Sequence, residues 1–356
     1  MDIFDNPDFD NHEHVAFGYD PGTGLRAVIA VHNTFLGPGL GGLRMWPYGS
    51  VAEAVGDVLR LSRGMTYKNA MAGLNLGGGK AVIIGDPKRD RTPALMRAMG
   101  HFVDRLGGLY ITAEDSGISV EDLRHLAECT DHVTGLHAGH DADGAERSGD
   151  PSPATALGVF EGMRACARRV HGTDSVSGMT VAIQGLGSVG YRLAGNLHAA
   201  GAELVVSDIN PLAVERAGIE FGARAAAPER IHAVECEIYA PCALGGAIND
   251  VTLRDLKAGI VAGAANNQLT RPEHGLALHE RGVLYAPDYV INAGGVIDVA
   301  AQRGEYDAAD VRRRVLGIAE TLMDVFERAE RSGERPELVA DRMAEERFGR
   351  RQAGFS

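Results

Sequence analysis

The sequence predicts a two-domain α/β protein whose C-terminal domain is built on a parallel, doubly wound sheet. The chain has 356 residues, more than a single hydrophobic core usually serves. In its second half, strand-like apolar runs alternate with helical periodicity, and a glycine-rich turn joins the first strand to its helix. Residues 136–151 are rich in Gly, Asp and His with little apolar content, which predicts a connection between the domains.

In the first half, the apolar run 26–32 predicts a strand, and the glycines of 37–42 predict a turn-rich stretch. The same patterns predict a helix over 51–67, a strand over 80–84, a helix over 93–106 and a strand over 109–113. Ser119 with Asp122 three residues later predicts a capping box that begins a further helix.

In the second half, Ser152 as N-cap and Pro153 at the first helical position predict a helix through about residue 170. The alternation then continues with strand 179–184, helix 188–200, strand 203–207, and strands near 236–240 and 259–263. The tail over 309–349 predicts two charged amphipathic helices.

Composition excludes several functions. A net charge of −13 argues against a nucleic-acid partner, which needs a basic surface. The acidic N-terminus has no secretory pattern, and no run approaches the ~18 apolar residues of a membrane span. The cysteines show neither CxxC pairs nor zinc-ligand spacing, so we expect free thiols, no metal site and a cytoplasmic protein; they are Cys129, Cys166, Cys236 and Cys242.

The glycine-rich turn predicts a dinucleotide site. Strand 179–184 leads directly into Gly185, Leu186, Gly187, Ser188, Val189 and Gly190, which open a helix. Such glycines allow a tight turn, close approach of a pyrophosphate, and helix–strand packing, as in Rossmann-type domains. Asp208 ends the next strand, where a carboxylate would bind a ribose diol and repel a 2′-phosphate, favouring NAD. The alternative is an unrelated turn, with Asp208 capping the next helix.

Two lysines form the most distinctive segment. Lys68 lies near a helix end, and Lys80 lies between Gly77–Gly79 and an apolar strand. Consecutive glycines are costly to order, so we expect the backbone there to approach a ligand closely. The alternative is a pair of surface lysines flanking a flexible loop.

Further motifs occur in a fixed order along the chain: Gly37–Arg44, Thr112–Asp115, Gly263–Gln268, Tyr285–Tyr289 and Asn292–Gly295. Together with the lysine segment they resemble the leucine, valine and phenylalanine dehydrogenases of the glutamate-dehydrogenase superfamily. The resemblance runs from about His12 to the C-terminus. It implies NAD-dependent oxidative deamination of an L-amino acid to its 2-oxo acid and ammonia, and the reverse reaction.

The resemblance also implies residue roles. Lys68 would bind the substrate carboxylate, aided by backbone groups of Gly41 and Gly42. Lys80 would hold the attacking water or the 2-oxo oxygen as acid/base, and Asp115 would shuttle protons to and from the amino group. An amine must be neutral before hydride leaves, which requires such a base. Taken alone, Asp115 also fits a turn or capping residue.

Four more positions would place the cofactor and its substrate. Asn266, with Asn267, Ala265 and Thr155, would position the nicotinamide amide or its ribose, and Asn266 would also contact substrate. The chain departs from the family at Ser116 and Ile118, where relatives commonly have Val and Thr. These two substitutions would change the local shape of the pocket and a contact with the cofactor.

The resemblance implies an apolar substrate. Leu40 and Val299 stand where glutamate dehydrogenases place a lysine and a serine, and neither can pair with a buried side-chain carboxylate. With Ala113 and Val296 they would line an apolar pocket. Branched-chain amino acids are the preferred prediction; phenylalanine or tryptophan is the alternative.

The family implies a first domain over 1–135, with 331–356 returning to it, that binds substrate and forms homo-oligomers. It implies an NAD-binding domain over 136–330 and a deep cleft between the two. A 2-hydroxy-acid dehydrogenase would ordinarily use a His and an Arg instead. A non-catalytic NAD-binding sensor would be expected to lack one of Lys68, Lys80 or Asp115, and the chain has all three.

Overall fold

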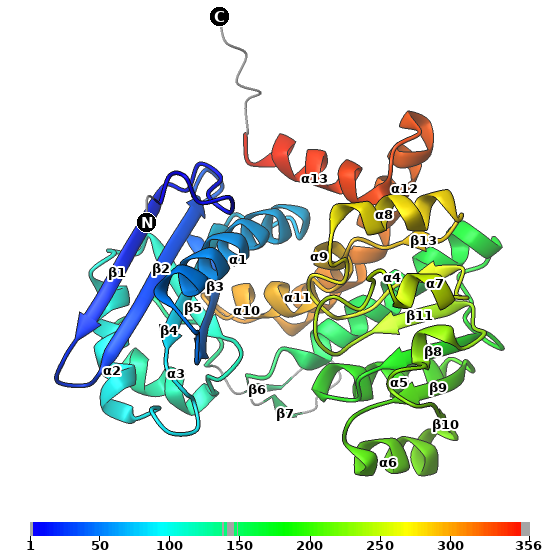
Figure 1. Ribbon diagram of the computed structural model, residues 1–356, viewed down its shortest axis with the longest axis horizontal. Coiled ribbons are helices and arrows are strands. Elements are labelled where there is room, and N and C mark those ends of the chain that lie inside the picture. The colour runs from blue at the N-terminus through cyan, green and yellow to red at the C-terminus, as the bar shows by residue number, and fades with distance from the viewer. Residues whose placement is uncertain (1–2, 137–138, 141–145, 148, 350–356) are drawn as a thin grey trace, which may run out of the picture. The chain divides into compact units, whose positions relative to one another are not determined.

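The computed structural model describes residues 3–136, 139–140, 146–147 and 149–349 (Figure 1). One compact unit contains Met1–Asp150, Val299–Ala308 and Ala344–Ser356, and the other Pro151–Asp298 and Ala309–Met343. Each unit has its own sheet, which confirms the predicted two-domain α/β class. The connection predicted over 136–151 lies partly outside the described residues; within it, β6 (Gly139–His140) pairs antiparallel with β7 (Glu146–Arg147).

The sheet of the first unit has five strands in the order β1-β2-β4-β3-β5. They are β1 (His14–Asp20), β2 (Leu25–Asn33), β3 (Gly39–Trp46), β4 (Gly77–Ile84) and β5 (Tyr110–Glu114). β3 is parallel to β4 and β5, whereas β2 is antiparallel to β1 and β4. The turn predicted over 37–42 was wrong from Gly39 onward, because these glycines enter β3 in the middle of the sheet.

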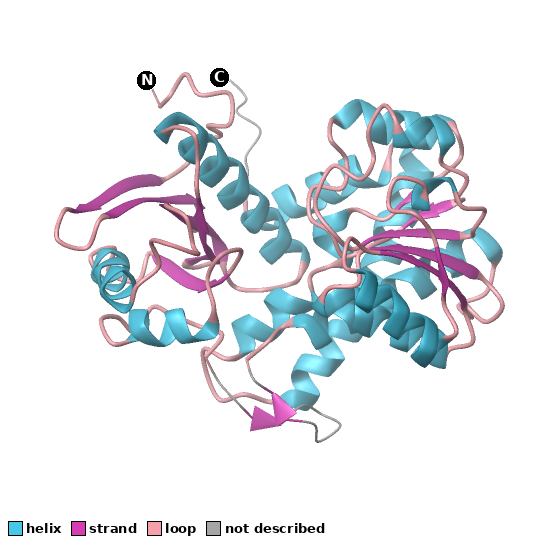
Figure 2. Cartoon of the chain, turned by 60° about the horizontal axis from the view of Figure 1, so that its bottom comes forward, coloured by secondary structure: helices cyan, strands magenta, loops and turns pink. Residues whose placement is uncertain are grey.

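Helices cover both faces of this sheet (Figure 2). α1 (Val51–Met71) packs on one face through Val58 and Leu59, which meet Val28 and Val82. α2 (Pro93–Asp104) and α3 (Val120–Ala127) pack on the other face against apolar side chains of β2, β3 and β4. Alternate residues of each strand therefore face α1.

Side-chain caps begin the helices of this unit. Ser50 accepts a hydrogen bond from the backbone nitrogen of Glu53, and α3 has the predicted capping box between Ser119 and Asp122. α1 continues beyond its predicted end at residue 67, so Lys68 lies in its last turn.

The sheet of the second unit has six parallel strands in the order β10-β9-β8-β11-β12-β13, as the alternating pattern predicted. They are β8 (Thr180–Gln184), β9 (Glu203–Ser207), β10 (Arg224–Ala225), β11 (Ile238–Pro241), β12 (Ile260–Val261) and β13 (Leu284–Tyr285).

The helices that precede, connect and follow these strands are α4 (Ser152–His171), α5 (Ser188–Ala199), α6 (Pro211–Phe221), η1 (Ile231–Ala233), α7 (Thr252–Asp255), α8 (Pro272–Glu280) and α9 (Asp288–Ile291). Ile231 and Leu278 pack with Tyr239 in a core cluster that places η1 and α8 on one face. The prediction of Ser152 as N-cap was wrong. Ser152 is the first residue of α4, and Pro151 precedes it without a side-chain cap.

The C-terminal region contains α10 (Gly294–Ala301), α11 (Ala308–Leu316), α12 (Ile318–Ser332) and α13 (Pro336–Arg347). Three helices rather than the predicted two occupy 308–347, because Gly317 separates α11 from α12 and Gly333, with a φ of 69°, ends α12. No helix in the described part of the chain is long and apolar enough to cross a membrane. The described residues also bring together no His, Cys, Asp or Glu group suited to a metal ion.

Candidate active site

The predicted acid/base residues share the face of the first sheet that α1 covers. The register of β3 and β4 places Lys80 beside Gly42. Gly42 pairs in turn with Ala113 of β5, and Asp115 follows Ala113 by two residues. Because side chains two residues apart on a strand point the same way, Lys80 and Asp115 meet across a position that has no side chain.

Lys80 and Asp115 form a buried ion pair. The Nζ atom of Lys80 lies 2.5 Å from Oδ2 of Asp115, and Nε of Arg44 lies 3.2 Å from the same oxygen. Lys80 is only 6% exposed, and a lysine so buried requires an anionic partner. The alternative that Lys80 is a surface lysine is therefore wrong.

The charges around Asp115 keep it ionised. Burial alone would raise its pKa, but the positive charges of Lys80 and Arg44 outweigh burial and lower the pKa to about 2. Burial and the neighbouring carboxylates instead raise the pKa of the adjacent Glu114. The site thus holds an ionised carboxylate between two cationic side chains.

This site can form because it is built on glycines: other atoms of the chain occupy the space that a Cβ at these positions would need. A Cβ on Gly42 would lie 2.7 Å from Cβ of Asp115, and one on Gly41 would lie 1.7 Å from the carbonyl oxygen of Gly79. A Cβ on Gly78 would lie 2.2 Å from the backbone nitrogen of Thr66 in α1. The three glycines of β4, expected to admit a ligand, are thus crowded by the chain's own atoms.

Lys68 lies half-buried in the last turn of α1, in the same unit as Lys80. Two contacts hold this end of the helix. The Asn69 amide donates a 2.6 Å hydrogen bond to the carbonyl of Gly77 in β4. The Arg347 guanidinium donates to the carbonyl of Ala70 at 2.5 Å. The structure therefore fixes the backbone that carries Lys68 from two directions.

The predicted apolar pocket residues divide between the two units. Leu40 and Ala113, 1% and 7% exposed, lie on the α1 face of the sheet with Lys80. Val299 also belongs to the first unit, and its carbonyl accepts a 2.7 Å hydrogen bond from the Thr134 hydroxyl. Val296 belongs to the second unit.

The two departures from the family pattern lie in different surroundings. Ser116 is exposed, and its carbonyl accepts a hydrogen bond from the backbone nitrogen of Met45. Ile118 is 5% exposed and packs in the core cluster beneath α2 and α3. Ile118 therefore fills the core on the face opposite Lys80.

In the second unit, the glycine-rich turn has the local geometry of a phosphate cradle. Gly185 has a φ of 99°, and a Cβ on Gly190 would lie 2.0 Å from its carbonyl oxygen. A Cβ on Gly187 would meet no atom within 4 Å. Gly187 is also the N-cap of α5 and supplies no side-chain cap, so the first N–H groups, from Ser188 and Val189 onward, suit an anion.

Asp208 is held against this turn. Its carboxylate accepts hydrogen bonds from the backbone nitrogens of Leu186 at 2.6 Å and Asn210 at 2.8 Å. The side chain of Asn210 accepts from the backbone nitrogen of Leu212 and caps α6. The alternative that Asp208 caps the next helix is therefore wrong.

Hydrogen bonds also fix the loop after β12. The side-chain oxygen of Asn266 accepts from the Asn292 amide at 2.8 Å, and the Gln268 amide donates to the carbonyl of Ala265 at 3.0 Å. Asn267 has a φ of 52°, which places it in the left-handed region. These contacts orient the exposed residues Asn266 and Asn267.

Thr155 lies in the first turn of α4. Its hydroxyl donates a 3.0 Å hydrogen bond to the carbonyl of Pro151, and a Cβ on Gly295 would lie 2.5 Å from that hydroxyl. Thr155 therefore belongs to the same unit as the glycine-rich turn and the loop after β12.

Four residues that support the site escaped the sequence analysis: Arg44, Asn69, Gln268 and Asn292. Each adjoins or lies within a quoted motif, and each carries a side chain that forms several hydrogen bonds. Their position in or beside the motifs was the one sequence feature that could have identified them as site residues. Their partners lie on other elements, so spacing alone did not identify them.

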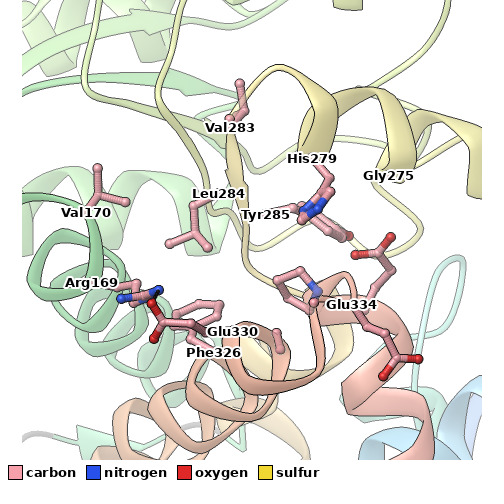
Figure 3. A pocket seen from close by; sticks show the side chains of 15 residues that line it. Arg169, Val170, Gly275, His279, Val283, Leu284, Tyr285, Phe326, Glu330 and Glu334 are labelled. Atoms are coloured by element: carbon pink, nitrogen blue, oxygen red, sulfur yellow. Dashed lines mark ion pairs between the residues drawn. The ribbon is translucent and has the colours of Figure 1, made fainter.

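A pocket of about 460 Å³ occurs in the second unit but is lined by other residues (Figure 3). Leu284, Tyr285 and Phe326 line it with apolar surface, and the Arg169 guanidinium pairs with Glu330 at 2.8 Å. None of the predicted catalytic or cofactor residues contributes to it.

Two family models match the chain. Residues 12–132 match the Glu/Leu/Phe/Val dehydrogenase dimerisation domain. Residues 148–226 and 220–302 match the glutamate/leucine/phenylalanine/valine dehydrogenase model.

Individual relatives are similar over nearly their whole length. Leucine dehydrogenase of Geobacillus stearothermophilus is 52% identical, covering 98% of this chain and 94% of the relative. Phenylalanine dehydrogenase of Bacillus thermotolerans is 44% identical, covering 95% and 88%. The crystal structure of L-tryptophan dehydrogenase from Nostoc punctiforme superposes with a TM-score of 0.81 at 41% identity, covering 96% of both chains. The resemblance inferred from the motifs is confirmed: the chain belongs to the Glu/Leu/Phe/Val dehydrogenase family.

Proposed function

We propose that the protein is an NAD-dependent dehydrogenase that converts an apolar L-amino acid, preferably leucine, valine or isoleucine, to its 2-oxo acid and ammonia, and catalyses the reverse reaction. The buried pair of Lys80 and Asp115 is the observation that carries this proposal. Burying two charges is costly, and a protein that only sensed NAD would have no need of them. Greater identity to leucine dehydrogenases than to phenylalanine dehydrogenases favours a branched-chain substrate.

The first unit would bind and activate the substrate. The ammonium of Lys68 would bind the carboxylate, and apolar side chains such as Leu40 would contact the substrate side chain. The anionic Asp115 would hold the amino group and take its proton, because an amine must be neutral before hydride leaves. Lys80 would hold the water that attacks the imine and stabilise the oxygen of the resulting carbinolamine.

The second unit would bind NAD, which supplies the hydride acceptor. The open position at Gly187 and the first N–H groups of α5 suit the pyrophosphate. An ionised carboxylate has about four acceptor positions, so Asp208 keeps acceptors for a ribose diol after its two backbone contacts. Its negative charge disfavours the 2′-phosphate of NADP. Thr155, Ala265, Asn266 and Asn267 would position the nicotinamide and its ribose.

The protein is further proposed to be a cytoplasmic homo-oligomer that assembles through its first unit. β1 is an edge strand, and its side chains Phe17 and Tyr19 are 61% and 72% exposed. Exposed aromatic side chains on an unpaired strand edge favour association. Its four cysteines are free, which suits a reducing compartment.

The test is NADH formation at alkaline pH with purified protein, NAD and a panel of L-amino acids. The panel contains leucine, valine, isoleucine, phenylalanine, tryptophan and glutamate. Lys80→Ala should lose at least ~100-fold in kcat. The matched control is Lys257→Ala, because this lysine is 51% exposed and pairs only at the surface with Glu235.

The pattern of turnover decides between the candidates. Lys80-dependent oxidation of the branched-chain amino acids supports the proposal, and a preference for phenylalanine or tryptophan would replace its substrate with an aromatic one. NAD binding without turnover of any amino acid, in either direction, would refute the dehydrogenase and favour a non-catalytic NAD-binding sensor. NADP preferred over NAD would contradict the role given to Asp208.

A further inference from the structure

Arg44 is a charged residue of the candidate active site that has no role in the proposed reaction so far. It follows the glycines of β3, and its side chain is 25% exposed. Its guanidinium joins two carboxylates: Nε lies 3.2 Å from Oδ2 of Asp115, and Nη1 lies 2.9 Å from Oδ2 of Asp57. A planar guanidinium with two occupied edges has little freedom to turn.

Asp57 holds Arg44 firmly because it is itself fixed. Its Oδ2 atom accepts a 2.6 Å hydrogen bond from the Tyr48 hydroxyl, and its Oδ1 atom accepts a 2.7 Å hydrogen bond from Nη2 of Arg60. The side chain of Asp57, in α1, is only 13% exposed. Asp57, in the helix that covers the site, thus anchors Arg44 through Nη1 while Nε contacts Asp115.

We propose that Arg44 is a positioning residue for proton transfer: anchored by Asp57, it holds the Asp115 carboxylate at the ammonium of Lys80 and sets the pH range in which that pair works. The inference rests on the proposed function, which gives the pair its role in proton transfer. The single oxygen Oδ2 receives both Lys80 and Arg44. Without Arg44, the carboxylate would keep Lys80 and the backbone N–H of Ser116 but would lose the guanidinium that restrains Oδ2.

The charges that face Asp115 predict the direction of the effect. Lys80 and Arg44 face it from β4 and β3, and Glu114 and Tyr110 interact with it from β5. Burial raises the pKa of Asp115, and the two cations lower it. Removal of one cation should therefore raise this pKa and move the acid limb of the rate profile to higher pH.

The experiment compares Arg44→Met and Arg44→Lys with wild type, using Arg89→Met as the matched control. Arg89 pairs with Asp86 at 3.1 Å, is 76% exposed, and contacts neither Asp57 nor Asp115 in the described structure. We expect Arg44→Met to lower kcat by about 10- to 100-fold, with a smaller change in the KM for the amino acid. Its acid limb should move to higher pH.

Arg44→Lys separates charge from geometry. An ammonium keeps the positive charge but cannot bridge two carboxylates with a fixed fork. We therefore expect an acid limb near that of wild type together with a reduced kcat. Profiles and rates for Arg44→Met that match those of Arg89→Met would overturn the inference.

A second measurement does not depend on turnover. The pH dependence of the unfolding free energy should show an acid transition at higher pH in Arg44→Met than in Arg89→Met. An inactive wild-type protein would refute the proposed function, whereas an active one with equal acid transitions and equal rates in both variants would refute only the role of Arg44.

Discussion

The three glycines of the motif at the start of α5, Gly185, Gly187 and Gly190, should separate cofactor binding from folding stability. A Cβ on Gly187 would meet no atom of the protein within 4 Å, whereas one on Gly190 would lie 2.0 Å from the carbonyl oxygen of Gly185. Gly187→Ala should therefore cost at most about 1 kcal/mol of stability, the usual effect of alanine at an N-cap. Gly190→Ala should cost about 1–3 kcal/mol, because backbone must move.

The effects of these glycine substitutions on NAD binding should follow a different order from their effects on stability. If the pyrophosphate lies over the start of α5, the methyl group of Gly187→Ala would occupy its place and weaken NAD binding at least tenfold, about 1.4 kcal/mol. The matched control is Gly195→Ala in the same helix, where a Cβ would make an ordinary 3.6 Å contact with Phe221. Calorimetric titration with NAD and chemical denaturation measure the two effects. Unchanged NAD affinity in a folded Gly187→Ala variant would refute the placement of the pyrophosphate.

Three more predictions concern the first unit. Gly42→Ala would place a Cβ 2.7 Å from Cβ of Asp115, so it should cost about 1–3 kcal/mol of stability and lower kcat while NAD affinity, measured by titration, stays unchanged. The pKa of Asp115 falls on folding from 3.8 to about 2, so its ionised form stabilises the fold above about pH 4, and this contribution is lost as pH falls toward 2. The difference in unfolding free energy between wild type and Asp115→Asn should shrink over that window; a constant difference would contradict the ion pair. Arg347→Met removes a charged donor from the carbonyl of Ala70 and should cost about 1–3 kcal/mol, with faster hydrogen exchange at the end of α1.

Local patterns predicted most of the fold because the forces that form its elements act over a few residues. The capping box at Ser119 and the strand–turn–helix at Gly185 are of this kind. The glycines of 37–42 predicted a turn because isolated glycines usually permit one. In the folded protein Gly41 and Gly42 lie in β3, and they are glycines because the carbonyl of Gly79 and the side chain of Asp115 leave no room for a Cβ. That demand comes from tertiary packing and has no local signal.

The candidate site shows the same division between local and distant causes. The identities of Lys80 and Asp115 came from motifs, but their contact depends on the register of three strands. Arg44 contacts a carboxylate 71 residues away, so no spacing rule connects the two. The charges that surround Asp115 could therefore be identified only from the folded structure.

The low pKa of Asp115 restricts how this carboxylate can act in the proposed reaction. A carboxylate held by two cations is a weak base, since an efficient general base has a pKa near the working pH. For Asp115 to take a proton from the substrate, one of its cation contacts must weaken when substrate binds. Arg44 is fixed by Asp57, whereas Lys80 ends a flexible side chain with three rotatable donors. Lys80 is therefore the contact that would turn from Asp115 to the reacting oxygen or water. The same movement would make Asp115 more basic at the step in which it accepts the proton of the amino group.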